Sequence, residues 1–265
     1  MPAPAGTPAP SRILTYGRII KFSHSVFALP FALASFFLAA RSGGIEPKRL
    51  FWVVIAMIGA RSAAMGFNRW VDAEIDAKNP RTAGREIPTG VLSKGQVLAF
   101  VVASGVALVA ASSQLNPLCF ALSPVALFII MGYSLTKRVT MFSHAVLGLS
   151  LAIAPVGAWL AVRGEFGAPA VILGLAVLFW VAGFDILYAC QDVEFDRSTG
   201  LHSVPARLGM GAALVVARAA HLLALACLLL LPAFEPLHHA SYFAGLTLVG
   251  ALFAYEHSTH KITFS

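Results

Sequence analysis

The sequence has 265 residues, of which 58% are hydrophobic and only 12% are charged, and its mean hydropathy is +0.79. Because a soluble domain carries about a quarter of its residues charged, this composition indicates a membrane protein and excludes a disordered chain and a secreted disulfide scaffold. The net charge of +7 is better explained by basic loops that face anionic membrane lipid than by nucleic acid, which we do not expect as a partner.

Eight apolar segments are long enough to cross a bilayer, for which a helix needs about 20 residues. We therefore expect an all-α fold: a polytopic transmembrane bundle of two four-helix-like halves, each with a cytoplasmic loop rich in aspartate. Residues 1–21 should form a cytoplasmic tail, 22–256 a single transmembrane domain and 257–265 a short C-terminal tail. The eight segments are 22–40, 50–68, 96–113, 116–135, 143–162, 167–188, 210–232 and 240–256.

The lysines and arginines predict the orientation of these segments. Most of the 19 basic residues fall in the N-terminal tail and in the loops that follow the even-numbered segments, with five between 69 and 95. The other side holds a smaller set: Arg41, Lys48, Arg49 and Arg163. Since loops rich in Lys and Arg stay in the cytoplasm, we expect both termini to be cytoplasmic and the chain to lie in the inner membrane of a bacterium.

The five aspartates gather at the cytoplasmic ends of the second and sixth segments. In a helix, side chains four residues apart lie on one face, which would align Asn68 with Asp72 and Asp76. The same spacing joins Asp192 and Asp196, and places Tyr188 and Asp185 on nearly the same face. Clustered carboxylates repel one another unless a cation lies between them, and hard oxygen ligands at a membrane edge suit Mg²⁺ bound together with substrate phosphates. Two facing clusters would thus hold a diphosphate through magnesium ions.

Basic residues beside these clusters are candidate ligands of a diphosphate. Lys78, Arg81 and Arg85 follow the first cluster, and Lys137 and Arg138 fill a short loop after the fourth segment. The alternative for each is that it only obeys the positive-inside rule.

Arg61 lies inside the second apolar segment, where a buried charge is costly and indicates function. It precedes Asn68 by about two helical turns and should share its face. Two roles are open: a structural ion pair with Asp72, or binding of an acceptor's carboxylate.

These motifs together resemble the intramembrane aromatic prenyltransferases of the UbiA superfamily, over nearly the whole chain. The family usually has nine membrane spans, against the eight predicted here. The motifs are R-S-A-x-x-G-x-N at 61–68, N-x-x-x-D-x-x-x-D at 68–76, R-T at 81–82, K-R-x-T at 137–140 and D-x-x-Y-A-x-x-D-x-x-x-D at 185–196.

The resemblance implies Mg²⁺-dependent transfer of a polyprenyl chain from polyprenyl diphosphate to the ring of an aromatic carboxylic acid. It implies that Asp185 positions or deprotonates the acceptor and that Lys137, Arg138 and Arg81 stabilise the leaving diphosphate. Among the aromatic residues, Phe67, Trp70 and Tyr188 are candidates to face the allylic cation. The implied magnesium ligands are Asn68, Asp72, Asp76, Asp192 and Asp196.

The acceptor is less well defined by the sequence. We expect 4-hydroxybenzoate, in ubiquinone or menaquinone biosynthesis. The Pro-Gln that often follows K-R-x-T in 4-hydroxybenzoate enzymes is absent from YSLTKRVTMFSHAVLG, and this makes 1,4-dihydroxy-6-naphthoate, an acceptor for menaquinone, the alternative. A membrane transporter would place its charges along a path through the bilayer, whereas here they collect on one side.

Overall fold

The computed structural model describes residues 29–41, 43–237 and 240–263, with side chains as far as 258, and every regular element in these ranges is helical. This confirms the predicted all-α class. The first predicted segment begins at 22, so its start lies outside the described residues, as do the N-terminal tail and the last two residues.

A helix occupies each of the eight predicted segments. Within the described residues, six helices are long and apolar enough to cross a membrane: α4 (Pro47–Val71), α6 (Lys94–Ser113), α7 (Pro117–Thr136), α8 (Ser143–Arg163), α9 (Ala168–Ala189) and α12 (Met210–Leu230). The described part of the first segment is the shorter apolar helix α3 (Leu29–Ala40). The eighth forms α13 (Ala240–Thr263), which is not among the six and which continues beyond the predicted start of the tail at 257.

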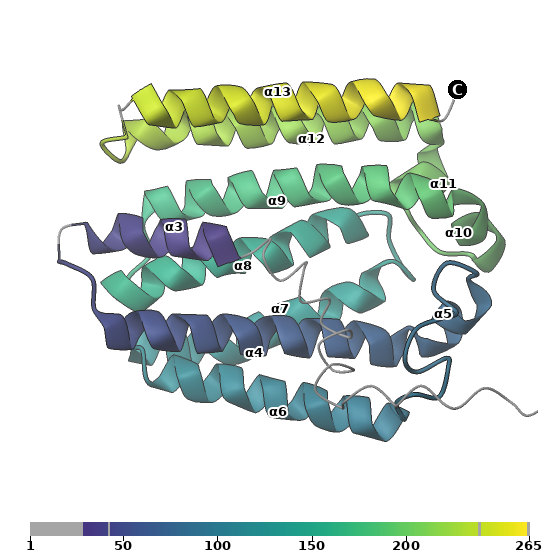
Figure 1. The fold of residues 1–265 in the computed structure, drawn as a ribbon, viewed down its shortest axis with the longest axis horizontal. Coiled ribbons are helices and arrows are strands. Elements are labelled where there is room, and N and C mark those ends of the chain that lie inside the picture. Colours follow the sequence, from purple (N-terminus) through teal and green to yellow (C-terminus); the bar gives the residue numbers. More distant parts are fainter. Residues whose placement is uncertain (1–28, 42, 238–239, 264–265) are drawn as a thin grey trace, which may run out of the picture.

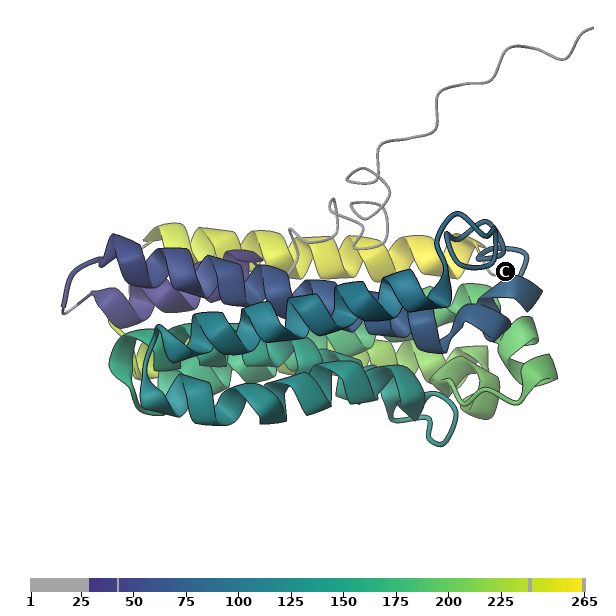
Figure 2. The same ribbon diagram turned by 90° about the horizontal axis from the view of Figure 1, so that it is seen from below.

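The long helices run along one common axis, as two perpendicular views show (Figures 1 and 2). The short helices α5 (Ala73–Lys78), α10 (Val193–Thr199) and α11 (Val204–Leu208) all lie at the same end of the bundle (Figure 1). The main packing partners are α4 with α6, α8 with α9, and α9 with α12, while α13 packs on α12. Both aspartate motifs therefore reach one end of the molecule.

The helix α3 does not stay with the first half of the chain. It packs mainly against α8, and the Ser35 hydroxyl donates a hydrogen bond of 2.6 Å to the carbonyl of Pro155 inside that helix. This hydrogen bond adds a polar link between two largely apolar helix surfaces. The first helix thus joins the two predicted halves.

Glycines allow two of these helix pairs to approach closely. A Cβ atom at Gly59 of α4 would lie 2.8 Å from the backbone oxygen of Ser104 in α6. At Gly148 of α8 it would lie 2.3 Å from the backbone oxygen of Leu178 in α9. Small residues at such crossings let membrane helices pack backbone against backbone, and these two contacts fix the walls of the cavity described below.

The structure corrects one detail of the helical pattern. A continuous helix through Asn68, Asp72 and Asp76 was the basis for placing them on one face, but α4 ends at Val71 and α5 begins at Ala73. Asp72 has φ −90° and ψ 2° at the junction. The i to i−4 hydrogen bonds still run from Asp72 to Asn68 and from Asp76 to Asp72, at 3.0 and 2.8 Å, so the bend redirects Asp76 without unwinding the chain.

Candidate functional site

A cavity of about 400 Å³ opens among four helices at the end of the bundle that carries the short helices. Its walls come from α4, α7, α8 and α9, and its rim from the segments that follow α5 and α10. Deep in the bundle the lining is largely apolar, with Met65, Leu147, Leu151 and Val181. This volume is in the range of small-molecule sites.

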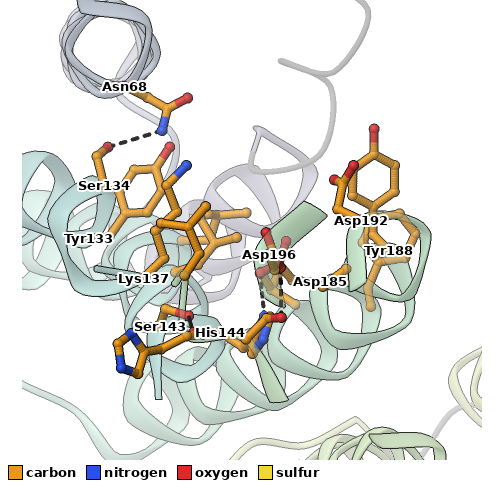
Figure 3. Close-up of a pocket in the computed structure, with 18 of the residues that line it drawn as sticks. Asn68, Tyr133, Ser134, Lys137, Ser143, His144, Asp185, Tyr188, Asp192 and Asp196 are labelled. Carbon is orange, nitrogen blue, oxygen red and sulfur yellow. Dashed lines mark hydrogen bonds and ion pairs between the residues drawn. The ribbon is translucent and has the colours of Figure 1, made fainter. Parts of the chain in front are cut away.

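The second aspartate cluster faces this cavity as predicted. Asp185, Tyr188, Asp192 and Asp196 all line it, from α9, the 3-10 turn Cys190–Asp192 and α10. Figure 3 shows these side chains on one side of the cavity, with Asn68 and Ser134 across from them. The hydroxyl of Ser203 donates a hydrogen bond of 2.7 Å to Asp196, which fixes this carboxylate against the segment before α11.

Arg81 joins the loop after α5 to the second cluster. Its Nε donates to Oδ1 of Asp192 at 2.9 Å, its Nη2 contacts Oδ2 of the same carboxylate, and its Nη1 donates to the Tyr188 hydroxyl at 2.9 Å. The guanidinium carbon also lies 5.2 Å from the centroid of the Tyr188 ring. Asn79 adds a hydrogen bond of 3.3 Å to Asp192. The hydrogen bonds to Asp192 raise the pKa of Arg81 above its usual value, so this cation stays charged at any working pH.

The first cluster is divided between the cavity and the protein behind it. Asn68 lines the cavity, whereas Asp72 and Asp76 are only 1% and 4% exposed and do not line it. The three side chains therefore do not face the cavity together, although their shared helix face had predicted that they would. The physical reason is that cations lie between these carboxylates and the cavity.

Asp72 accepts three hydrogen bonds: from Asn68 at 3.1 Å, from Lys137 Nζ at 2.5 Å and from Arg138 Nη2 at 3.0 Å. Both oxygens of Asp76 accept from Nη1 of Arg85 at 2.7 Å. Lys137 and Arg85 themselves line the cavity. Each carboxylate of the first cluster is therefore bound to a cation that lines the cavity.

The remaining predicted cations differ in their position. Arg61 lines the cavity. Within the described part of the chain, the ion pairs of Asp72 are with Lys137 and Arg138. Arg138 is exposed and also donates to the backbone oxygen of Val71 at 2.8 Å. Lys78 is exposed and, like Arg138, is not among the cavity-lining residues.

The aromatic lining is only partly the predicted one. Tyr188 lines the cavity, but Phe67 and Trp70 stack on each other with centroids 5.9 Å apart, and Trp70 packs against the cluster of Leu92 and Val97. The other aromatic rings at the cavity are Tyr133, Trp180 and Phe184, which the sequence motifs did not single out.

Sequence reasoning also missed His144. This histidine lines the cavity and lies 2.7 Å from Asp185, measured from Nδ1 to Oδ2. The spacing of His144 from other histidines did not indicate a metal site. Its position after K-R-x-T, where Pro-Gln is expected but absent, was the sequence feature that could have indicated a role for it.

The oxygen-rich rim fits a hard divalent cation that shares its ligands with a phosphate. Among the described residues, no three Asp, Glu, His or Cys side chains come close enough to bind a metal by themselves. Mg²⁺ commonly uses one or two carboxylates and completes its coordination with water and substrate phosphates. Asp192 and Asp196 on one side of the rim, with Asn68 across from them, provide such an incomplete set.

Comparisons with known proteins agree with this geometry. Residues 28–263 match the UbiA prenyltransferase family. A 4-hydroxybenzoate octaprenyltransferase from Aeromonas hydrophila is 31% identical over 203 residues, which is 77% of this chain and 70% of that enzyme.

Solved structures of UbiA homologues have the same fold. The apo structure of a homologue from Aeropyrum pernix K1 has a TM-score of 0.84 and 30% identity, and covers 91% of this chain and 90% of that one. A homologue from Archaeoglobus fulgidus, bound to DMAPP and Mg²⁺, has a TM-score of 0.73 at 18% identity, over 92% of this chain and 86% of that one. The protein therefore belongs to the UbiA prenyltransferase family and is a membrane-embedded polyprenyltransferase.

Proposed function

We propose that this enzyme transfers a polyprenyl group from polyprenyl diphosphate to the ring of 4-hydroxybenzoate, with Mg²⁺, in quinone biosynthesis. The observation that carries the proposal is a single cavity with Arg61 in its membrane-embedded part and Arg81, Lys137, Asp192 and Asp196 at its rim. Such a cavity can hold an anionic diphosphate at one end and the carboxylate of an aromatic acid at the other. The relative from Aeromonas hydrophila supports this acceptor by its name.

The rim would bind the diphosphate. Asp192 and Asp196 are proposed as ligands of one magnesium ion, and Asn68, Asp72 and Asp76 as ligands of another. The homologue bound to DMAPP and Mg²⁺ supports the use of magnesium with a prenyl diphosphate in this fold. When bound, magnesium would supply positive charge that stabilises the leaving diphosphate. Lys137 and Arg85, which now hold Asp72 and Asp76, would then exchange carboxylate oxygens for phosphate oxygens.

The other cations would act around this exchange. Arg81 is proposed to move from Asp192 to the diphosphate, because its fork of donors matches phosphate as well as carboxylate. Arg138 would keep Asp72 in place from the outer side, and Lys78 would add positive charge at the entrance, since both are exposed at this end of the bundle.

The membrane-embedded part would bind the acceptor and the prenyl chain. Arg61 is proposed to hold the acceptor's carboxylate, Asp185 to position the acceptor or take its proton, and Tyr188 to face the allylic carbon. Apolar side chains such as Leu147 and Leu151 exclude water, which would otherwise capture the allylic cation.

One observation favours a second acceptor, 1,4-dihydroxy-6-naphthoate. Ser143 and His144 line the cavity in the segment where 4-hydroxybenzoate enzymes often carry Pro-Gln, so the acceptor end has a different polar lining. The naphthoate also has a carboxylate, and Arg61 would keep its role.

The proposed location is the bacterial inner membrane, with the cavity's rim and both termini on the cytoplasmic side. The basic loops at this end of the bundle support that orientation through the positive-inside rule.

The acceptor assay tests the proposal directly. Membranes that contain the enzyme would be incubated with Mg²⁺, a polyprenyl diphosphate and either aromatic acid, and products identified by mass spectrometry. A C-prenylated 4-hydroxybenzoate is the expected product, prenylated naphthoate alone would favour the second acceptor, and no product from either acid would refute the proposed acceptor class.

A further inference from the structure

The buried imidazole of His144 is fixed from both sides. It lies near the start of α8 with 4% of its surface exposed, and its Nδ1 is 2.7 Å from Oδ2 of Asp185. On its other side, Nε2 is 3.2 Å from the backbone nitrogen of Val204. Because a backbone N–H can only donate, Nε2 must accept, and the proton of the neutral ring is therefore on Nδ1.

This tautomer makes His144 a hydrogen-bond donor to Asp185. Of the two carboxylate oxygens, Oδ2 is occupied by the imidazole, while Oδ1 accepts no hydrogen bond within the described part of the chain. Asp185 lines the cavity, so Oδ1 is the oxygen left for a ligand. The hydrogen bond from His144 therefore fixes the orientation of this carboxylate.

The contact with Val204 also ties His144 to the segment that follows the second aspartate cluster. Next to it, the Ser203 hydroxyl donates to Asp196, and Val204 is buried in a cluster with Ile186 and Leu187 of α9. His144 thus links three elements: α8, the end of α9 and the start of α11. A histidine that served only to fill space would not need both ring nitrogens to be matched in this way.

We propose that His144 is a positioning residue for proton transfer, which holds the Asp185 carboxylate with Oδ1 directed at the hydroxyl of the aromatic acceptor. The inference rests on the proposed function and extends it, because it names Oδ1 of Asp185 as the atom that binds the acceptor's hydroxyl. It requires an acceptor with a hydroxyl beside the ring carbon that is alkylated.

The chemical step balances without any further reactant. The acceptor's O–H bond breaks and its proton passes to Oδ1 of Asp185, while the neighbouring ring carbon forms a bond to the first carbon of the prenyl chain. The bond from that carbon to the diphosphate oxygen breaks, and its electron pair leaves with the diphosphate. The alkylated ring carbon then loses its proton to an oxygen of the released diphosphate, and Oδ1 of Asp185 returns its proton to the ring oxygen. This restores both the hydroxyl and the carboxylate.

Other ionisable groups line the same cavity as His144 and contribute to its electrostatic field. They are Arg61 from α4, Arg81 and Arg85 after α5, Tyr133 from α7, Lys137 after α7, Tyr188 from α9, Asp192 and Asp196 after it, and His202 before α11. Among the described residues, only His144 forms a hydrogen bond with the Asp185 carboxylate, which makes it the group that orients this side chain.

A double-mutant cycle tests the proposal. His144→Ala should lower kcat for the hydroxylated acid by about 10²-fold, in the range of acid–base contributions, and leave KM for the polyprenyl diphosphate unchanged. His144→Gln should recover much of the loss, because its amide can donate to Asp185 and accept from Val204. Adding His144→Ala to Asp185→Asn should cause no further loss, since two residues that act as a unit are not additive.

His221→Gln is the matched control. This histidine is also buried, at 2% exposure, but it lies on α12 and stacks on Phe253 at a centroid distance of 4.3 Å, away from the cavity. The variant should keep the wild-type kcat. Thermal unfolding in detergent shows whether each variant is folded. If His144→Ala does not fold, the double-mutant cycle is carried out with His144→Gln instead.

Two results would overturn the inference while the proposed function stands. One is a His144→Gln enzyme as impaired as a folded His144→Ala enzyme; the other is losses that multiply in the double variant. A wild-type enzyme that prenylates no aromatic acid would instead refute the proposed function, and this inference with it.

Discussion

Arg81 and Asp192 form a two-point ion pair that connects the loop after α5 to the start of α10, with Nε and Oδ1 2.9 Å apart. Arg81 follows the first aspartate cluster, and Asp192 belongs to the second. The pair places a fork of donors where a diphosphate would bind.

Arg81→Lys should weaken catalysis although the charge is kept. Lysine is a point charge and cannot reproduce two parallel hydrogen bonds to carboxylate or phosphate. We expect kcat/KM for the polyprenyl diphosphate to fall by about 10²-fold, in the range found when one charge-stabilising donor is removed. Steady-state kinetics with varied diphosphate measures this.

Lys94→Ala is the control for Arg81→Lys. Lys94 pairs with Glu74 at 3.1 Å, but these side chains are 52% and 85% exposed, and such surface pairs contribute little. An equal loss in both variants would show that Arg81 acts only through the general charge of this end of the bundle.

Asp72→Asn and Asp192→Asn should each abolish turnover while the bundle stays folded. Each change removes a carboxylate proposed to bind magnesium, and the cations that hold Asp72 are partly exposed, at 33% for Lys137 and 37% for Arg138, so water can solvate them. Product formation and the unfolding temperature are the two measurements. Glu74→Gln, an exposed change on α5, is the control, and near-normal turnover by both aspartate variants would remove the proposed role of the two clusters.

Arg61→Ala should raise KM for the aromatic acid more than KM for the polyprenyl diphosphate. A guanidinium that binds a carboxylate contributes charge-assisted hydrogen bonds of about 1.5–3 kcal/mol, equivalent to roughly a 10- to 100-fold change in affinity. The comparison uses the acid and an analogue without the carboxylate, for which the variant and wild type should be alike. Arg218→Ala, on α12, is the matched intramembrane control. A rise in KM for the polyprenyl diphosphate alone would show that Arg61 binds the donor and not the acceptor.

Gly148→Ala should destabilise the bundle. Its Cβ atom would lie 2.3 Å from the backbone oxygen of Leu178, so α8 and α9 must separate, and overpacking of this kind costs about 1–3 kcal/mol. Gly157→Ala is the control in the same helix, because a Cβ atom at Gly157 meets no atom within 4 Å. Unfolding temperatures in one detergent should fall for Gly148→Ala alone; equal values would mean that the α8–α9 contact has room to adjust.

The helical fold could be predicted from the sequence because the bilayer leaves few alternatives. A spanning segment must satisfy its own backbone hydrogen bonds, so apolar length alone located the helices, including the segments that became α4, α6, α7, α8, α9 and α12. Packing was not predictable in this way. The association of α3 with α8 combines a hydrogen bond from Ser35 to Pro155 with a shared apolar cluster that includes Phe36 and Leu160, and hydropathy does not show which apolar helices pack together.

The sequence predicted which residues contribute to the candidate site better than it predicted their arrangement. The four-residue spacing correctly brought Asp185, Asp192 and Asp196 to one cavity, because these residues follow the turns of α9 and α10. The same spacing failed for Asp72 and Asp76, since the bend at Asp72 and the cations Lys137 and Arg85 separate them from the cavity. His144 and Asp185 are 41 positions apart in the chain, and no local pattern could have joined them.

Binding of magnesium and geranyl diphosphate, measured by isothermal titration without an acceptor, tests most directly whether the two aspartate clusters share one ligand. The account predicts that binding requires Mg²⁺ and that Asp72→Asn and Asp192→Asn, one from each cluster, both weaken it by about 10²-fold or more, in the range expected when a buried charge loses its partner. Wild-type affinity in either folded variant would contradict it.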